Sequence, residues 1–283
     1  MKTIGFVDYY LSEWHANNYP AWIKQANSEL ATDYQVKYAW AEKDISPVDG
    51  VSTDEWCKNM GTIRCESIEE LCEKCDTIVI LSPSNPEKHL EYAKKVLPFK
   101  KPTYIDKPFA DTKESANEIF AIAEKYGTPF FSTSALRYAT ELDFIKECTA
   151  ITTLGGGSNL EEYIIHQAEM VVKKLGIGAK CIKAQAISQS QYFFTIKYTD
   201  NRMAGMHFVK GGAPFVITLS PDDTSDALHK NITSDFFYIL IKDIIKFFEE
   251  KMPSFNTQET LEVNKILVSA VKAKSALDEW IEI

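Results

Sequence analysis

The sequence predicts an α/β protein with two domains, a doubly wound parallel sheet followed by an α+β domain with a mainly antiparallel open sheet. Three observations lead to this fold class. Short apolar runs alternate with helical segments over the first 133 residues, an uninterrupted apolar run stands at 77–81, and short alternating runs follow later in the chain. The first two are typical of buried parallel strands joined by helices. The third is typical of an antiparallel sheet.

The elements of the first domain follow from the spacing of apolar residues. We expect strands at 3–7, 34–41, 77–81, 102–105 and 129–132, and helices at 12–30, 67–75, 86–97 and 112–126. An unbroken apolar run such as 77–81 belongs in the middle of a parallel sheet that helices cover on both faces. Residues 1–133 are therefore predicted to form one doubly wound domain.

The pattern changes after residue 133. We expect a helix at 161–175, strands at 181–189, 192–198, 203–209 and 215–219, and amphipathic helices at 235–251 and 257–280. Turn-forming residues separate these strands at short intervals, which favours antiparallel pairing. Residues 134–283 are therefore predicted to form the second, α+β domain.

Composition and charge exclude several classes of protein. The net charge is -9, from 40 acidic and 31 basic residues, and no basic block is long enough to follow a phosphate backbone. We therefore expect no nucleic acid partner. No stretch approaches the ~20 apolar residues that a membrane span needs, and the first residues lack the apolar region of a signal peptide. A cytoplasmic location without membrane contact is the expectation.

The six cysteines are too sparse for a disulfide framework in a chain of 283 residues. The one close pair, Cys72 and Cys75, could be half of a zinc site or a redox dithiol. No second Cys or His pair stands near it in the sequence, and free cysteines pack readily as small apolar side chains. We therefore favour core thiols and expect no metal site.

Ligands of open parallel sheets bind at the carboxyl ends of the strands. Three turns lie at such ends: the turn after Val7, the turn 82–86, and the segment Asp106-Lys107-Pro108 after a predicted strand. Lys107 is the strongest candidate, because the proline beside it restricts the backbone. Partial burial would lower the pKa of its ammonium group and allow proton exchange with a substrate hydroxyl. The alternative is a surface lysine next to a turn proline.

A second candidate group lies on the predicted helix at 161–175. Glu162 and His166 are four residues apart and therefore share one face of the helix, which Glu169 extends. A carboxylate beside an imidazole can orient the ring and raise its basicity. The alternative is a histidine with a purely structural role.

The order of these motifs resembles that of a known family. The chain shows Ser82-Pro83, a helix with His89, then Asp106-Lys107-Pro108, a long helix and Arg137-Tyr138. This order is similar to the first domain of the glucose-fructose oxidoreductase and inositol dehydrogenase family, the Gfo/Idh/MocA group. There the tripeptide is usually Glu-Lys-Pro. The glycines at 155–157 that lead to Glu162 and His166 resemble the second motif of the family.

The resemblance implies a Rossmann-type domain that binds NAD or NADP, and a second domain for substrate binding and oligomerisation. The expected partners are a hydroxylated small molecule, such as a polyol or sugar, and further copies of the chain in a dimer or tetramer formed through the C-terminal sheet. Lys107 would contact the reacting hydroxyl, His166 would act as general acid/base, and Glu162 would replace the usual Asp. The implied cofactor contacts are Asp8, Tyr10, Leu11, Glu42, Ser82, Pro83, Asn85, His89, Asp106 and Lys107.

The loop after the first strand departs from the family pattern. Every glycine expected there is missing, although glycines permit the tight turn and the approach of a diphosphate. Asp8 adds negative charge, and Tyr9 and Tyr10 add bulk. Each departure is expected to weaken dinucleotide binding by on the order of 1 to 3 kcal/mol. After the second strand, Glu42 or Asp44 suits ribose hydroxyls whereas Lys43 suits a phosphate, so NAD and NADP both stay open.

Three functions are consistent with these residues. The first is an NAD(P)-dependent oxidoreductase that acts on a sugar-like or polyol substrate, with Lys107 and His166 handling the proton. The second is a non-catalytic or regulatory ligand-binding protein of the same fold that has lost normal dinucleotide binding. The third is a glycosidase or lyase that uses the nicotinamide transiently.

Overall fold

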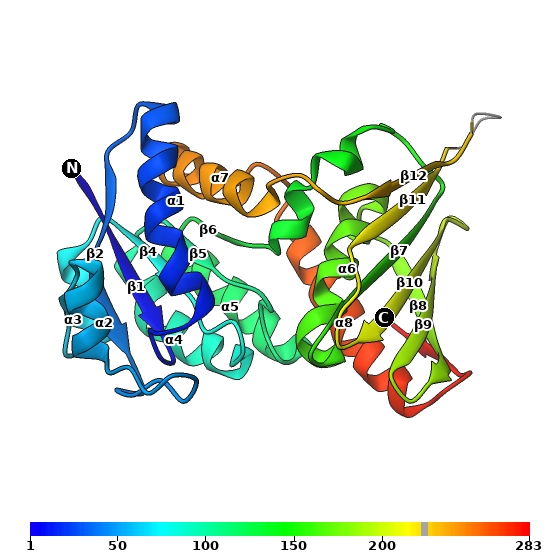
Figure 1. The fold of residues 1–283 in the computed structure, drawn as a ribbon, viewed down its shortest axis with the longest axis horizontal. Coiled ribbons are helices and arrows are strands. Elements are labelled where there is room, and N and C mark those ends of the chain that lie inside the picture. The colour runs from blue at the N-terminus through cyan, green and yellow to red at the C-terminus, as the bar shows by residue number, and fades with distance from the viewer. Residues whose placement is uncertain (222–225) are drawn as a thin grey trace. The chain divides into compact units, whose positions relative to one another are not determined.

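The computed structural model describes residues 1–221 and 226–283. By their internal contacts these residues form two compact units (Figure 1). The first unit comprises Met1–Thr133 and Tyr238–Phe255, and the second comprises Ser134–Phe237 and Asn256–Ile283. Each unit is described by itself below.

The first unit is built on a sheet of six parallel strands in the order β3-β2-β1-β4-β5-β6. Its strands are β1 (Lys2–Asp8), β2 (Tyr34–Ala41), β3 (Ile63–Arg64), β4 (Thr77–Ile80), β5 (Thr103–Ile105) and β6 (Phe130–Ser132). The chain runs outward from β1 in one direction and then from β4 in the other, which is the order of a Rossmann fold. The predicted fold class of this part is confirmed.

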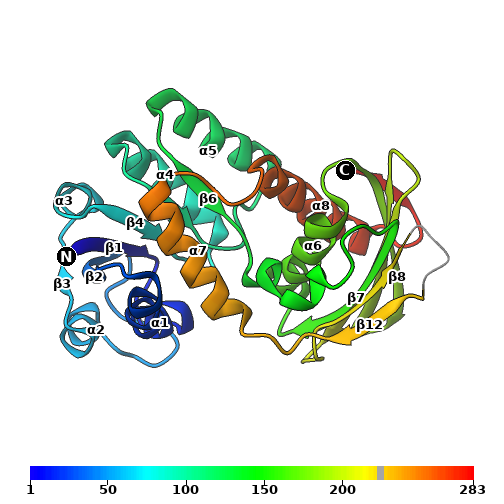
Figure 2. The same cartoon turned by 90° about the horizontal axis from the view of Figure 1, so that it is seen from above.

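Helices cover both faces of this sheet. They are α1 (Trp14–Leu30), α2 (Thr53–Met60), α3 (Ile68–Lys74), α4 (His89–Val96) and α5 (Lys113–Tyr126), with short 3-10 turns η1 (Pro86–Lys88) and η2 (Leu97–Phe99), and α7 (Phe236–Glu250) returns from far along the chain. Figure 2 shows α1 and α7 on one face of the sheet and α4 and α5 on the other. The parallel sheet is therefore covered by helices on both faces, as its apolar strands require.

Helix α7 packs on the first unit although the sequence-based division at residue 133 assigned it to the second domain. Phe247 lies 4.8 Å from Phe131 of β6, and Phe248 lies 5.7 Å from Tyr34 of β2, measured between ring centroids. The apolar face of the helix buries these rings against the sheet. An amphipathic pattern shows that a helix must pack on something, but it does not show which sheet the helix covers.

The second unit contains a seven-stranded sheet in the order β12-β11-β7-β10-β9-β8-β13. Its strands are β7 (Ala150–Gly157), β8 (Ala179–Ser188), β9 (Gln191–Tyr198), β10 (Met203–Lys210), β11 (Val216–Ser220), β12 (Leu228–Asn231) and β13 (Trp280–Glu282). Only the pair β7 and β10 is parallel among the pairs that the structure describes. This agrees with the predicted mainly antiparallel sheet.

Two helices of this unit, α6 (Leu160–Leu175) and α8 (Gln258–Ser275), lie on one face of the sheet. Short 3-10 turns η3 (Ala135–Tyr138) and η4 (Thr140–Asp143) precede β7. Apolar residues of both helices and of the strands share one core, which includes Ile164, Met170, Phe194, Phe208 and Ile266. The predicted helix at 257–280 ends earlier, at Ser275, and the chain then forms the edge strand β13.

None of the helices in residues 1–221 and 226–283 has the length and the hydropathy needed to cross a membrane.

The glycines at 155–157 end strand β7, where the backbone meets its neighbours closely. A Cβ atom at Gly156 would lie 2.4 Å from the carbonyl oxygen of Val209 and 2.7 Å from the amide nitrogen of Ala213. Both contacts are with backbone atoms, so neither neighbour can turn away as a side chain could. The glycine is therefore required by the packing of β7 against the end of β10.

We predict that Gly156→Ala lowers the free energy of unfolding by about 1 to 3 kcal/mol, because the added methyl group overpacks this site. Thr152→Ala, at an exposed position of the same strand, is the control and should change stability by about 0.5 kcal/mol or less. Urea denaturation of the three proteins measures both effects. Equal stability of the Gly156→Ala variant and the wild type would contradict the packing argument.

Candidate functional site

The carboxyl end of β1 carries a buried acid. Asp8 is 1% exposed, and its Oδ1 accepts hydrogen bonds from the backbone N–H groups of Tyr9 (2.7 Å) and Ser82 (3.0 Å). Its Oδ2 is buried without a hydrogen-bond partner. Burial, and then the nearby negative charge of Glu13, hold the pKa of Asp8 well above its usual range. The first loop thus places an acid where the family pattern has glycine.

A second acid caps helix α1. Glu13 is 8% exposed, and its carboxylate accepts hydrogen bonds from the backbone N–H groups of His15 (2.8 Å) and Ala16. The same carboxylate lies 3.0 Å from Nδ1 of the His15 ring. A carboxylate at this position satisfies helix amides that have no partner within the helix and interacts favourably with the helix dipole.

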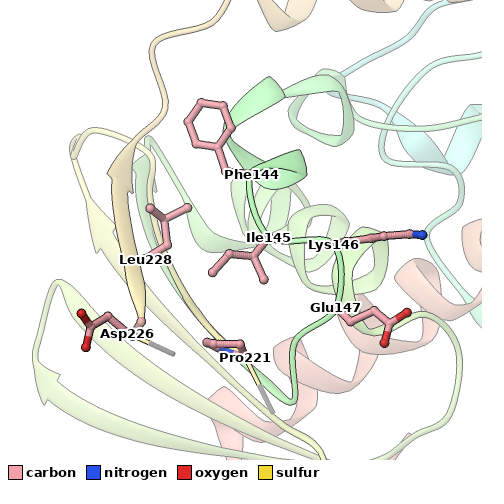
Figure 3. A pocket seen from close by; sticks show the side chains of 8 residues that line it. Phe144, Ile145, Lys146, Glu147, Pro221, Asp226 and Leu228 are labelled. Carbon is pink, nitrogen blue, oxygen red and sulfur yellow. The ribbon is translucent and has the colours of Figure 1, made fainter. Parts of the chain in front are cut away.

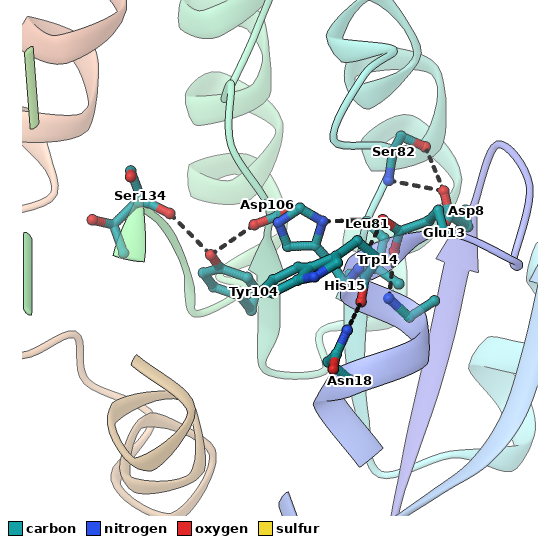
Figure 4. A network of polar contacts seen from close by, with 12 residues as sticks. Asp8, Glu13, Trp14, His15, Asn18, Leu81, Ser82, Tyr104, Asp106 and Ser134 are labelled. Carbon is teal, nitrogen blue, oxygen red and sulfur yellow. Dashed lines mark hydrogen bonds and ion pairs between the residues drawn. The ribbon is translucent and has the colours of Figure 1, made fainter. Parts of the chain in front are cut away.

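His15 connects Glu13 to a third acid at the end of β5. Nε2 of His15 lies 3.7 Å from Oδ2 of Asp106, which is buried. Oδ1 of Asp106 accepts a hydrogen bond from the Tyr104 hydroxyl at 3.1 Å. Figure 4 shows these side chains as one connected group between the start of α1 and the end of β5. The carboxyl ends of β1 and β5 are therefore bridged by an acid, an imidazole and an acid.

The acid after β2 is also engaged within the protein. Glu42 lies 2.8 Å from Nζ of Lys88 and accepts a hydrogen bond of 2.8 Å from the Tyr92 hydroxyl. Although burial by itself raises the pKa of Glu42, the hydrogen bonds from Lys88 and Tyr92 lower it below its ordinary value. Glu42 is therefore an ionised group whose two oxygens already have partners.

Most of the other expected cofactor contacts lie inside the protein. The His89 ring is fully buried, with Nδ1 3.1 Å from the carbonyl oxygen of Phe109 and Nε2 against that of Leu81. Burial lowers the pKa of His89. Leu11 and Pro83 are buried as well. These three side chains are packed against the strand ends. Because they are buried, they offer a cofactor almost no exposed surface.

Tyr10 and Asn85 are half-buried and keep some exposed surface. The Asn85 amide donates a hydrogen bond to Glu87 at 3.0 Å. The ring of Tyr10 lies 6.1 Å from that of Tyr9, in an edge arrangement. These two remain the accessible members of the expected cofactor contacts in the first loop and in the turn after β4.

Lys107 stands directly after β5 and is half-buried. Within the described residues its ammonium group makes no hydrogen bond or ion pair. The neighbouring Asp106 is directed into the group with His15 and Tyr104. A half-buried ammonium group without an internal partner can donate hydrogen bonds to a ligand.

In the second unit, His166 is held by a residue that sequence reasoning did not find. The ring is 6% exposed, and its Nδ1 lies 2.6 Å from Oγ of Ser134. The rings of Tyr163 and Phe215 lie edge-on to it, at 5.8 and 5.6 Å between centroids. Ser134 follows a predicted strand end, which is the signal that could have marked it.

Glu162 lies in the first turn of α6 and is half-buried, and its backbone N–H donates to Asn159 at 2.8 Å. Nδ1 of the His166 ring contacts Ser134 Oγ, so the expected orientation of the ring by Glu162 does not act through this nitrogen. Glu162 and His166 are nevertheless on the same side of the helix, as the spacing of four residues predicts.

Glu169 has a structural partner. It is 2% exposed, its Oε1 lies 2.5 Å from Nε of Arg137, and its Oε2 accepts the backbone N–H of Ser134 at 3.1 Å. Arg137 also binds Glu259 of α8 at 2.6 Å. This buried ion pair joins η3 to α6, and the same Glu169 carboxylate holds the Ser134 backbone beside His166. Glu169 therefore supports the position of the candidate histidine and does not extend a reactive face.

The cysteines are reduced, and Cys72 and Cys75 are both buried. Burial raises the pKa of the Cys75 thiol to about 12. In the described part of the chain, no group of three or more His, Cys, Asp or Glu residues could hold a metal ion. The thiols are therefore in the environment of core residues.

One pocket of the second unit contains none of the predicted site residues. It has a volume of about 460 Å³ and is lined by Phe144, Ile145, Lys146, Glu147, Pro221, Asp226, Ala227 and Leu228 (Figure 3). We assign no role to it.

The strand order and the covering helices define the class of this protein: a Rossmann-type fold joined to an α+β unit with an open sheet. The family model described as "Oxidoreductase family, NAD-binding Rossmann fold" matches residues 41–134. The resemblance to the Gfo/Idh/MocA group is thereby confirmed, and the chain has the fold of its dehydrogenases. A comparison with curated proteins found no match.

Solved structures with the same fold support this class. The myo-inositol dehydrogenase of Lactobacillus casei, solved with NAD(H) and myo-inositol, has a TM-score of 0.81 and 11% identity over 100% of this chain and 97% of that one. A probable dehydrogenase of Thermotoga maritima has a TM-score of 0.79 and 10% identity over 99% and 98%. A dehydrogenase of Clostridium difficile has a TM-score of 0.74 and 15% identity over 96% and 99%. At these identities the likeness concerns the fold.

The family implies a nicotinamide dinucleotide, but the residues at the start of α1 do not fit its diphosphate. Rossmann folds bind this group at the N-terminus of the first helix, where free backbone N–H groups meet the phosphates. Here the N–H groups of His15 and Ala16 already donate to Glu13, and that of Ser82 donates to Asp8. These N–H groups are therefore already engaged and do not offer free donors to a phosphate.

We predict that Asp8→Asn stabilises the protein more at about pH 8 than near pH 4. The folded-state pKa of Asp8 lies above the ordinary value of 3.8. Its contribution to stability is therefore complete below that value and is lost as pH rises through the folded pKa. Asparagine does not ionise and keeps an acceptor at Oδ1, so the gain over the wild type should reach about 1 to 3 kcal/mol at high pH. Urea denaturation across this pH range measures it, and a difference that is independent of pH would contradict it.

We predict that Glu169→Ala lowers the free energy of unfolding by about 3 to 5 kcal/mol, because it leaves the buried Arg137 guanidinium without its Glu169 carboxylate. Glu161→Ala on the same helix removes an exposed ion pair with Lys274 and should cost about 0 to 1 kcal/mol. Thermal or chemical denaturation compares the two variants. A similar loss of unfolding free energy in both variants would show that the buried ion pair stabilises the protein no more than the exposed one does.

Proposed function

We propose that this protein is an oxidoreductase that acts on a polyol or sugar-like hydroxyl or carbonyl, with Lys107 and His166 handling the proton. The observation that carries the proposal is how the His166 side chain is held in the second unit. Its Nδ1 lies 2.6 Å from Ser134 Oγ, and the aromatic rings of Tyr163 and Phe215 pack edge-on against its imidazole. The contact with Ser134 Oγ holds the ring in one orientation and engages Nδ1. A histidine prepared in this way is suited to general acid/base chemistry.

Lys107 supports the same chemistry from the first unit. It follows the carboxyl end of β5, which is where residues of open parallel sheets meet their ligands, and within the described residues its ammonium group has no competing partner. An ammonium group donates hydrogen bonds to a hydroxyl and stabilises the alkoxide that forms when the hydroxyl loses its proton. Glu162, in the first turn of α6, is proposed as a further substrate contact.

Oxidation of an alcohol releases one proton and one hydride. In the proposal His166 accepts the proton from the hydroxyl, and Lys107 balances the negative charge that develops on the oxygen. The hydride requires an acceptor, for which the family implies NAD or NADP. Because the residues at the start of α1 do not fit the diphosphate of that cofactor, the proposal covers proton handling and substrate recognition alone. We further propose that the chain associates into a dimer or tetramer through the second sheet and that it is cytoplasmic.

A specific observation favours a second function, a ligand-binding or regulatory protein that does not catalyse. Glu13 caps the helix that normally receives the diphosphate, and such a cap is compatible with a protein that has no need of the dinucleotide. Lys107 and His166 would then recognise the hydroxyl groups of the ligand by hydrogen bonds without transferring a proton. No observation favours the glycosidase or lyase alternative over these two.

Substrate recognition is tested by calorimetric titration of the purified protein with a set of polyols and sugars that includes myo-inositol. We expect saturable binding of at least one of them. Where the wild type also turns the ligand over with an added nicotinamide cofactor, Lys107→Ala and His166→Ala should each lower kcat/KM by about 100-fold or more, since each removes a proton-handling group. Lys58→Ala, at an exposed position of α2, is the control and should leave both measurements unchanged.

The outcomes separate the two functions. Binding with turnover supports the oxidoreductase, whereas binding without turnover under all cofactor conditions supports the ligand-binding protein. A wild type that binds none of the hydroxylated compounds would contradict both, and full activity of the His166→Ala variant would remove that residue from the reaction.

A further inference from the structure

The protein supplies its own anion to the N-terminus of helix α1. We infer that the Glu13 carboxylate occupies the position at which a Rossmann fold receives a diphosphate, so that this chain is closed to dinucleotides in their usual pose unless Glu13 is displaced. This goes beyond the proposed function, which concerns the substrate hydroxyl and not the dinucleotide.

The first step of the argument is the set of donors. A helix N-terminus offers a few N–H groups without partners and a partial positive charge of about half a unit, which together attract anions. Glu13 takes the N–H groups of His15 and Ala16 and brings one full negative charge to the same place. A phosphate arriving there would meet occupied donors and a like charge.

The second step concerns the turn between β4 and α4. The Ser82 N–H, which follows β4, donates to Asp8 at 3.0 Å, and the Tyr9 N–H donates to the same oxygen. The donors at the ends of the two central strands are thus taken by a second carboxylate. Asp8 and Glu13 lie close enough for the charge of Glu13 to raise the pKa of Asp8, so a further anion would add to an existing repulsion.

The third step is that Glu13 is held in place. It is 8% exposed, and the His15 ring contacts it at 3.0 Å while its other nitrogen lies 3.7 Å from Asp106. Displacing Glu13 would therefore break two helix-capping hydrogen bonds and the contact with His15 together. Glu13 is therefore a buried part of the folded structure, and a ligand could displace its side chain only by breaking these contacts.

A matching arrangement stands at the position that would receive the ribose. Both oxygens of Glu42 have partners, Lys88 and Tyr92. The ring of Tyr9 lies between Lys43 and Lys88, with each ammonium group 5.8 Å from its centroid. A dinucleotide in the usual pose would contact the amides at the start of α1 and the acid after β2. Both already have partners within the chain.

The experiment removes the closure and looks for binding that was not there before. Glu13→Ser leaves a residue that is well suited to cap a helix but removes the charge and shortens the side chain. The probes are NADH and inorganic pyrophosphate, followed by isothermal titration calorimetry and, for NADH, by the quenching of tryptophan fluorescence, since Trp14 adjoins Glu13. Glu114→Ser, which removes an exposed acid from the first turn of α5, is the matched control.

We expect no saturable binding of either probe to the wild type or to Glu114→Ser up to about 1 mM, which is the range of weak complexes. Glu13→Ser should bind both probes at least about 10-fold more tightly than the wild type, and the double variant Asp8→Asn/Glu13→Ser more tightly again, because like charge at short range is removed stepwise. Glu13→Gln, which keeps the shape of the cap, serves if Glu13→Ser fails to fold and should show a smaller gain.

Two results would overturn the inference. One is saturable NADH binding to the wild type at micromolar concentrations, which would show that the site is open as it stands. The other is a folded Glu13→Ser or Glu13→Gln variant, and a folded double variant, that bind neither probe. Polyol binding is measured separately and without dinucleotide, so a failure of the proposed function leaves a different signature from a failure of this inference.

Discussion

The structure depends on how the first unit buries three acids around the carboxyl ends of the parallel strands β1 and β5. Asp8 ends β1, Asp106 follows β5, and Glu13 begins the helix after β1. Buried carboxylates are costly unless hydrogen-bond donors or opposite charges surround them. Backbone N–H groups meet Asp8 and Glu13, and a histidine and a tyrosine hydroxyl meet Asp106. The backbone N–H groups at the start of α1, which other Rossmann folds use to bind a ligand, here donate to a buried carboxylate of the chain itself.

Much of the fold could be predicted from the sequence, because the strands of both sheets are apolar runs of distinct type. The predicted strand at 34–41 has the bounds of β2, and the runs at 192–198 and 203–209 lie within β9 and β10. Strand β7, which ends in three glycines, was missed, as were several elements that are short or polar. Helix α2 has eight residues, β3 has two, and β12 is mostly exposed. Their positions depend on neighbouring strands and not on a periodic pattern of their own.

Only part of the candidate site could be predicted. A sequence shows which residue types are present, but it does not show which atoms they contact after folding. The missing glycines are visible in the sequence, and so is the charge of Asp8. That Glu13 would cap α1 and contact His15 could not be read from the loop, because both contacts depend on where the helix begins. His89 was a reasonable cofactor contact by its place after β4, yet the helix turns its ring inward onto two carbonyl oxygens. Ser134 was missed because its place after a strand end does not show that its hydroxyl contacts a histidine 32 residues away in the sequence.

The two units therefore differ in how they relate to the chemistry of the family. In the second unit, the buried pair of Arg137 and Glu169 holds Ser134, and Ser134 holds His166, so several residues act together to fix one imidazole nitrogen. In the first unit, a comparable number of interactions fixes Glu13 on the amides of α1. In both arrangements a buried side chain is held by hydrogen bonds, although Oδ2 of Asp8 and Oδ2 of Asp106 are buried without a hydrogen-bond partner among the described residues. The first unit thus holds a carboxylate on the amides of α1, and the second holds an imidazole on the Ser134 hydroxyl.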